Sequence, residues 1–286
     1  MFADMHIHSQ YSDGTLNIQE IVKKAKAQNI SLISVCDHNT IEAYQKEGDF
    51  CAKSGIKLIT GVEIQAVMDD KEHHILAYSF NIENTALPEL LEYNRSILNE
   101  MGKRLIQNMS KDHKSLSPDE FSKHKRDPKN GGWDGLDYLK SKGLARDWTD
   151  YFTYAKQYNI TLDRKFKHPA DVIKIIHNAK GYAILAHPGE GIAHSIQKCK
   201  ETALKFLPLG IDGFECYYPS HTNEATEAFL NLCREHDLIV TAGSDDHGGF
   251  NNIPGGCEYD MSTGKVAIGL IKKLCPYPAN KQIKGE

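Results

Sequence analysis

The chain has 286 residues, of which 40% are hydrophobic and 25% are charged, and its formal net charge is −4. This composition allows an ordinary globular core, and the negative charge argues against a general nucleic-acid coat. No run of about 18 apolar residues is present, so no membrane span is expected. The seven cysteines are scattered without CxxC spacing, and no secretory signal pattern is seen, which favours reduced thiols and a cytoplasmic location.

Strand and helix patterns alternate through the first third of the chain. The sequence predicts a strand at 2–8, a helix at 17–28, a strand at 31–36, a helix at 41–54, and strands at 56–64 and 74–80. A long amphipathic helix is expected at 87–109. The alternation then stops, because residues 110–168 are polar and rich in lysine and aromatic residues. We interpret this stretch as a small helical insertion.

The alternation resumes at Pro169, a residue suited to the first turn of a helix. The remaining predicted elements are a helix at 169–179, a strand at 182–187, a helix at about 194–206, a strand at 211–216, a helix at 222–236 and a strand at 238–245. Six or seven such steps indicate an α/β protein, either a parallel barrel or a doubly wound sheet.

Ionisable residues stand at or beside one end of nearly every predicted strand. They are His6, His8, His38, Glu63, His73, His74, His187, Glu215, Asp245 and His247. The active sites of parallel barrels gather residues from many strand ends, so these side chains are expected to converge. Charges buried without partners are costly, and bound metal ions would remove that cost. Histidine and carboxylate ligands without thiolates suit Zn, Mn or Fe(II) better than Mg.

Six motifs together resemble one known family. HIHSQYSDGT, CDHNT, GVEI, HHILAY, AHPG and GSDDHGG occur in this order over residues 2–80 and 181–249, and they resemble the PHP family, named for polymerase and histidinol phosphatase domains. The resemblance implies a distorted (β/α)7 barrel and a site with three metal positions. Two or three divalent ions (Mn, Zn or Fe) are expected to bind there. The same resemblance implies a barrel domain of residues 1–98 and 169–286 and a helical lid of residues 99–168.

The resemblance also implies which residues hold each ion. The first ion would be held by His6, His8, Glu63 and Asp245; the second by Glu63, His74 and His187; the third by Asp13, His38 and His247. His73 is expected at the surface. Asp246 is expected behind the ligands or exposed, and Asp4 is expected to orient a ligand histidine or to have no role.

The implied activity is that of a metal-dependent phosphomonoesterase acting on small nucleotide-like substrates, such as nucleoside 5′-phosphates or 3′,5′-bisphosphates. A hydroxide bridging two metals would attack phosphorus in line. His221 is predicted to protonate the leaving group, and His221, Tyr218 and Arg104 are predicted to contact the substrate. The expected partner is a small phosphorylated molecule, such as a nucleotide or a short oligonucleotide. Neither association with a membrane nor a stable nucleic-acid complex is expected. The oligomeric state is left open.

Four alternatives stay open. A histidinol-phosphate phosphatase would share the barrel and the metals. A 5′-3′ exoribonuclease is supported by the basic stretch within residues 103–129. An amidohydrolase usually has a bridging lysine, where this chain has Glu63. A non-catalytic binding module is disfavoured because all nine implied ligand positions are filled.

Overall fold

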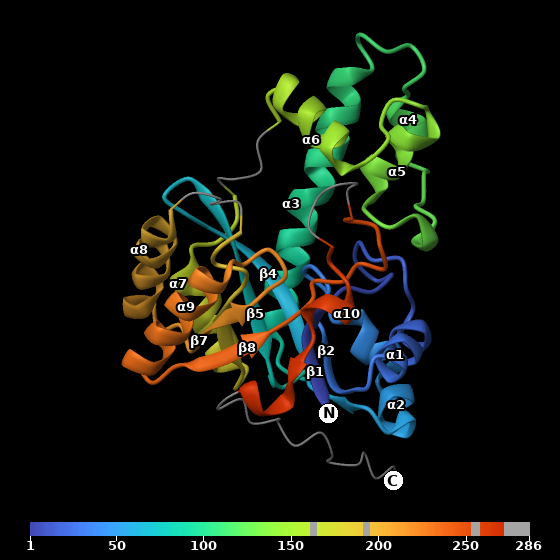
Figure 1. Cartoon of the computed structure of the whole chain (residues 1–286). Coiled ribbons are helices and arrows are strands. Elements are labelled where there is room, and N and C mark those ends of the chain that lie inside the picture. Colours follow the sequence, from blue (N-terminus) through green and yellow to red (C-terminus); the bar gives the residue numbers. More distant parts are fainter. Residues whose placement is uncertain (161–164, 191–194, 253–257, 272–286) are drawn as a thin grey trace.

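The computed structural model describes residues 1–160, 165–190, 195–252 and 258–271. Strands and helices alternate before and after the stretch interpreted above as an insertion, and the described residues of that stretch form helices and no strand (Figure 1). The α/β class is therefore confirmed. The predicted helix at about 194–206 begins outside the described residues. None of the helices in the described part of the chain is both long and apolar enough to cross a bilayer.

The first sheet has four strands in the order β3-β2-β1-β9. Its strands are β1 (Phe2–Ile7), β2 (Ile30–Val35), β3 (Lys57–Leu58) and β9 (Val266–Ala267). The first three are parallel, and β9 is antiparallel to β1. Two helices pack beside it, α1 (Ile18–Ala27) and α2 (Glu42–Ser54). A reciprocal capping box between Asn17 and Glu20 starts α1, because it satisfies two backbone donors that the helix leaves free.

The second sheet has five strands in the order β4-β5-β6-β7-β8. They are β4 (Gly61–Met68), β5 (Lys71–Tyr78), β6 (Tyr182–Leu185), β7 (Gly213–Tyr217) and β8 (Ile239–Ala242). Strand β5 is antiparallel to both β4 and β6, whereas β6, β7 and β8 are parallel. Asp69 and Asp70 form the two-residue turn before β5, and both have positive φ, which matches the twist of a tight hairpin.

Two expectations about these strands are wrong. The predicted strand at 56–64 is two separate strands, β3 and β4, which belong to different sheets. Strand β5 runs against the parallel direction, so its opening residues lie at the edge where β6 ends: the backbone N–H of Ala186 donates to the carbonyl of His74. Because the predicted strand at 56–64 is divided, Glu63 is the third residue of β4 rather than the end of a strand.

Between the two sheets the described residues form only isolated β-bridges, although Met5 of the first sheet and Leu76 and Ile184 of the second belong to one shared hydrophobic core. Ile7 bridges to Asp246, and His38 bridges to Glu63. Backbone hydrogen bonds of 2.9 Å from His8 N to the Asp246 carbonyl and 2.8 Å from Asp245 N to the His6 carbonyl connect β1 to the segment after β8. The sheets are thus not closed into one continuous ladder, and the (β/α)7 barrel stays a prediction.

Three helices cover the five-stranded sheet: α7 (Pro169–Asn178), α8 (Ile196–Phe206) and α9 (Asn223–Glu235). They lie on the side away from α1 and α2 (Figure 1). Phe206, Phe214 and Phe229 are fully buried in the shared core. Burial of one such side chain stabilises the fold by roughly 1.5–3 kcal/mol, so this layer fixes the strands that carry the polar residues described below.

Helix α3 (Ala86–Met109) extends from the sheets into the insertion (Figure 1). The insertion contains α4 (Pro118–Phe121), η1 (Pro128–Asn130), α5 (Asp134–Ser141) and α6 (Trp148–Gln157). Leu87, Leu90 and Leu91 belong to the core of the five-stranded sheet, whereas Met101 and Leu105 belong to a separate core in the insertion. The partners of α3 thus change between residues 91 and 101. The shorter elements are η2 (Leu207–Leu209), α10 (Met261–Gly264) and η3 (Ile268–Leu270).

Candidate metal centre

His6 and His8 begin the cluster of polar residues. They point the same way because strand side chains alternate with a period of two, and neither ring is accessible to solvent. Three groups of side chains that could hold a metal ion surround them in the described residues. Asp245 and His187, which line the same site, have positive φ values of 54° and 28°. Non-glycine residues seldom adopt such backbone conformations, and those that do cluster at functional sites.

The first group contains His6, His8, Glu63 and Asp245. The Nε2 atoms of His6 and His8 are 3.1 Å apart. Glu63 Oε2 lies 3.3 Å from His6 Nε2 and 3.2 Å from His8 Nε2. Asp245 Oδ1 lies 3.3 Å and 3.0 Å from the same two atoms. Tetrahedral ligands at about 2.0–2.1 Å from an ion are about 3.3–3.4 Å from one another, so these five distances are close to those of a tetrahedral site. They are the four residues predicted to hold the first ion.

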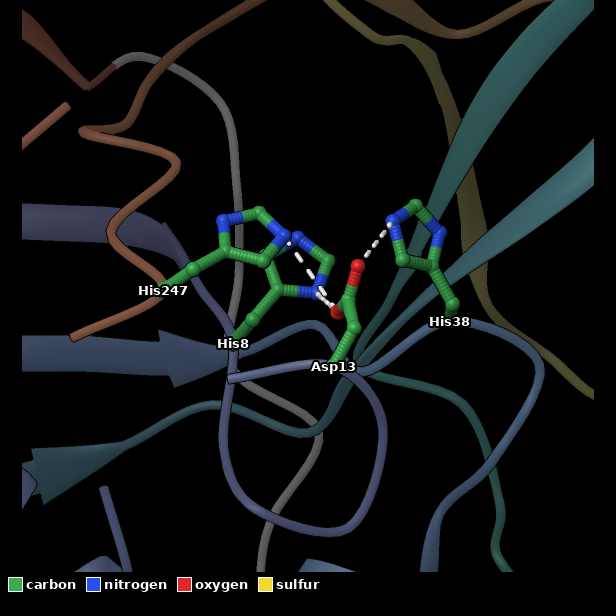
Figure 2. A group of neighbouring side chains, drawn as sticks. All are labelled: His8, Asp13, His38 and His247. Atoms are coloured by element: carbon green, nitrogen blue, oxygen red, sulfur yellow. Dashed lines mark ion pairs between the residues drawn. The ribbon is translucent and has the colours of Figure 1, made fainter. Parts of the chain in front are cut away.

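The third group contains His8, Asp13, His38 and His247 (Figure 2). Asp13 lies between the three rings: its Oδ1 is 3.5 Å from His8 Nδ1 and 3.3 Å from His247 Nε2, and its Oδ2 is 3.6 Å from His38 Nε2. The structure thus brings together the three residues predicted for the third ion and adds His8. His8 faces the first group with Nε2 and the third with Nδ1. Because a neutral imidazole keeps a proton on one nitrogen, it serves one ion at a time.

The second group contains His38, Glu63 and His74. His74 Nδ1 lies 2.9 Å from Glu63 Oε1, and His38 Nδ1 lies 3.2 Å from Glu63 Oε2. His187, which was predicted here, also contacts Glu63, with Nε2 3.0 Å from Oε1. Among the described residues, His38 rather than His187 lies mutually close to Glu63 and His74, and the role of His187 as a ligand stays a prediction. Glu63 therefore faces histidines with both oxygens, which suits a carboxylate shared between two ions.

The pKa values of the cluster show strong mutual attraction of its charges. Burial, the largest influence, would lower the pKa of His6, but Glu215, Glu63 and Asp245 raise it well above its ordinary value. The same opposition raises the pKa of His8 to about 10. Burial would likewise raise the pKa of Glu63, but His38, His6 and His74 hold it well below its usual range. Carboxylates that hold protons on neighbouring histidines this firmly form a site that attracts cations.

Some of the candidate ligand atoms lack a hydrogen-bond partner, which also fits a site for metal ions. His8 Nδ1, His38 Nδ1 and Asp245 Oδ1 are buried polar atoms without a hydrogen-bond partner in the described structure. Orphaned buried atoms of this kind are rare in folded proteins, and these three lie in different groups, so ions bound in the three groups would give each of them a partner. Imidazoles combined with carboxylates and no thiolate suit Zn, Mn or Fe(II).

Three glutamates contact the far nitrogens of the histidines. Glu215 Oε1 lies 3.0 Å from His6 Nδ1. Glu190 Oε2 lies 3.0 Å from His187 Nδ1, and Glu72 Oε1 lies 3.0 Å from His74 Nε2. Such carboxylates orient a ligand histidine and fix which nitrogen carries the proton. Glu215 was predicted only to converge with the other strand-end residues, and no role was predicted for Glu72 and Glu190, although these two lie two and three residues from His74 and His187.

Asp4 and Asp246 are both buried and hold the segment after β8. Asp4 accepts hydrogen bonds from Ser244 N (3.0 Å) and Ser244 Oγ (2.5 Å), and burial raises its pKa to about 7. Asp246 forms an ion pair with Lys24 and accepts from the backbone of Gly248. It is therefore not exposed, and it acts behind the ligands. His73 is half-buried and packs against Phe206, so its expected surface position is only partly correct.

The three predicted substrate contacts differ in their surroundings. His221 Nδ1 donates to the Cys216 carbonyl at 3.1 Å, and Nε2 accepts from Gly189 N at 3.0 Å. For His221 to donate a proton to a leaving group, one of these bonds must break. Tyr218 is 6% exposed, and its hydroxyl donates to Asp245 Oδ2 at 2.8 Å. Arg104 is exposed on α3 and lies outside the three groups.

Fold and site together define an α/β protein with overlapping groups of side chains that could hold metal ions. The model of the PHP domain family matches residues 4–241. The chain therefore belongs to the PHP domain family.

Relatives of known name match almost the whole chain. A 5′-3′ exoribonuclease of Haemophilus influenzae is 28% identical over 251 residues, which cover 85% of this chain and 89% of that protein. A 3′,5′-nucleoside bisphosphate phosphatase of Chromobacterium violaceum is 22% identical over 264 residues and covers 85% of this chain and 86% of that protein. A solved structure of an amidohydrolase from Chromobacterium violaceum has a TM-score of 0.72 at 23% identity, covers 86% of this chain and 87% of its own, and shares the fold.

Proposed function

We propose that the protein is a metal-dependent phosphoesterase that hydrolyses phosphomonoesters of small nucleotide-like substrates. The observation that carries this proposal is the set of three overlapping donor groups that share Glu63, His8 and His38. Overlapping groups place ions close together, and closely spaced ions are suited to the attacking and leaving oxygens of a phosphoryl transfer. The nucleoside bisphosphate phosphatase among the relatives supports a nucleotide-like monoester as the substrate.

The chain's own residues supply ligands and orientation rather than a nucleophile. When bound, divalent ions neutralise phosphoryl oxygens and activate water. Glu63 would link the first and second groups through its two oxygens, which lie against different histidines. Glu215 holds His6 with Nε2 directed into the first group. Tyr218 holds Asp245 through its second oxygen, which leaves Oδ1 directed at the two histidines.

We further propose that residues 1–98 and 169–286 form the barrel domain and residues 99–168 form a lid. The separate core of the insertion supports this division, and the boundary at residue 98 falls in α3 where its packing partners change. The described thiols of Cys36, Cys199, Cys216 and Cys233 are free and buried, which supports a reducing, cytoplasmic location.

A second candidate function is 5′-3′ exoribonuclease activity. The specific observation in its favour is the 28% identity to the Haemophilus influenzae exoribonuclease across most of both chains. The basic stretch within residues 103–129 also belongs to the insertion, where exposed lysines and arginines would attract a phosphate backbone.

A substrate screen separates these functions. Protein loaded with Mn is tested against nucleoside monophosphates, 3′,5′-bisphosphates, histidinol phosphate and a 5′-phosphorylated short RNA, while bound metal is measured in parallel. We expect phosphate release from the nucleotide monoesters, loss of that release in His8→Ala, and full release in His236→Ala, which removes an exposed histidine at the C-cap of α9. Faster processive cleavage of RNA would favour the exoribonuclease. Fewer than two ions per chain at saturation would contradict the metal centre.

A further inference from the structure

The insertion contacts the loop that carries Asp13. This loop, residues 9–14, follows β1 and presents Asp13 to the third group. Arg126, which comes from the insertion, donates through Nη2 to two carbonyls of the loop, Gln10 O at 2.9 Å and Ser12 O at 2.7 Å. Its Nη1 also donates to Pro128 O at 3.3 Å, so the half-buried guanidinium is held from its own side as well. One planar side chain thus ties two distant segments together.

Further contacts hold the same two segments together. The backbone N–H of Gly132 donates to the Asp13 carbonyl at 2.8 Å. The Phe250 ring packs against Gly131 and Gly132, where a Cβ atom would come within 2.7 Å and 2.9 Å of the ring, and both glycines have positive φ. Phe250 also lies beside His247, with ring centroids 6.4 Å apart. The segment 126–132 therefore contacts the Asp13 loop directly and the His247 segment through Phe250.

The loop is held from the inner side by Asp37. Its carboxylate accepts from Ser9 N at 2.8 Å, Ser9 Oγ at 2.6 Å and Ser12 Oγ at 2.6 Å. Asp37 holds the loop from the sheet side and Arg126 from the insertion side. Ser12 is bound by both, and the next residue is Asp13. The position of the Asp13 carboxylate therefore depends on the insertion as much as on β1.

We propose that Arg126 is a positioning residue for the ion of the third group, and that docking of the insertion and binding of this ion stabilise each other. The inference rests on the proposed function, because it concerns the ions of that centre. The Arg126 guanidinium sets the loop, the loop sets Asp13, and Asp13 completes the ligands with His38 and His247. Such coupling is reciprocal, so the bound ion also favours the docked insertion. The first group contains no residue of this loop, and its ion is expected to be independent of Arg126.

The test compares Arg126→Ala with Arg146→Ala. Arg146 is also an insertion arginine, but its guanidinium is 85% exposed and pairs with Asp150 inside the insertion. Stepwise Mn binding is measured by equilibrium dialysis with metal analysis and by electron paramagnetic resonance of the bound ions. We expect Arg126→Ala to weaken the binding of one ion by about 10- to 100-fold, the range for residues that support a metal ligand, and to leave the binding of the other ions unchanged. Arg146→Ala is expected to bind all ions like the unchanged protein.

Two outcomes would overturn the inference. One is a folded Arg126→Ala protein that binds every ion with unchanged affinity. The other is a raised KM with all ions bound normally, which would make Arg126 a substrate contact. If Arg126→Ala does not fold, Arg126→Lys keeps the charge but loses the two-carbonyl fork, and it is expected to show a smaller loss at the same ion. The binding readout does not depend on turnover, so a protein that fails every phosphoester can still confirm or refute the role of Arg126.

Discussion

Glu215→Gln tests how far the metal centre depends on a residue that is not a ligand. Glu215 is fully buried on β7 and serves two donors: Oε2 accepts from the backbone N–H of His187 at 2.8 Å, and Oε1 lies 3.0 Å from His6 Nδ1. Glutamine has the same shape but only one acceptor oxygen. If that oxygen faces His187, the new amide group faces His6 Nδ1. That nitrogen must then accept, and the imidazole proton moves to Nε2, the atom directed at the first group.

The expected loss follows from these contacts. In either orientation one charge-assisted hydrogen bond is lost, which is about 1.5–3 kcal/mol. At about 1.4 kcal/mol per tenfold change, this predicts about 10- to 100-fold weaker binding of the first ion. The assay is competition for Mn or Zn against a fluorescent chelator, with thermal unfolding as a check on folding. Glu227→Gln on α9 is the control, because that side chain is 66% exposed. A folded Glu215→Gln protein that binds the first ion within twofold of the unchanged protein would refute the tautomer argument.

Two further predictions concern stability. The pKa values of His8 and His74 are raised from 6.5 to about 10 in the metal-free fold, where burial opposes but neighbouring carboxylates dominate. Their contribution to folding is therefore complete below pH 6.5 and is lost as pH rises toward 10. The Tm of chelator-treated protein should fall across that window, while the affinity for Mn, measured by calorimetry, should rise. A Tm and an affinity that do not change with pH would contradict this prediction. Gly61→Ala should lower the free energy of unfolding by more than about 2 kcal/mol, because the new Cβ would meet Ser34 Oγ at 2.2 Å. Gly48→Ala, in α2, should raise the free energy of unfolding by roughly 0.5–1 kcal/mol, because nothing lies within 4 Å of the new Cβ. Denaturant melts of both variants check the pair, and equal effects would show that the glycine at position 61 is not needed for close packing.

Much of the local structure follows from the sequence because it depends on nearby residues. The helix predicted at 87–109 is observed as Ala86–Met109, because its apolar residues recur at helical spacing along its whole length. The strand predicted at 2–8 is observed as Phe2–Ile7, and its period of two places His6 and His8 together. The two-residue Asp69-Asp70 turn could have indicated a hairpin, but the alternation of strands and helices elsewhere favoured parallel strands.

The direction of β5, the separation of β3 from β4 and the supporting residues were decided by tertiary structure. An apolar strand pattern records which side chains are buried and not which neighbour they pair with, so Glu63 was expected at a strand end and lies inside β4. The candidate ligand types and their motifs were in the sequence, but the closeness of His38, rather than His187, to both Glu63 and His74 depends on distances between segments. Glu215 reaches His6 across 209 residues and Arg126 reaches Ser12 across 114, and no local pattern reports contacts of that range. The sequence by itself determined that histidines and carboxylates suited to metal ions stand at the predicted strand ends, because ligand chemistry belongs to residue type. Only the folded chain decided which atoms meet and what holds them, because that depends on packing between segments far apart in sequence.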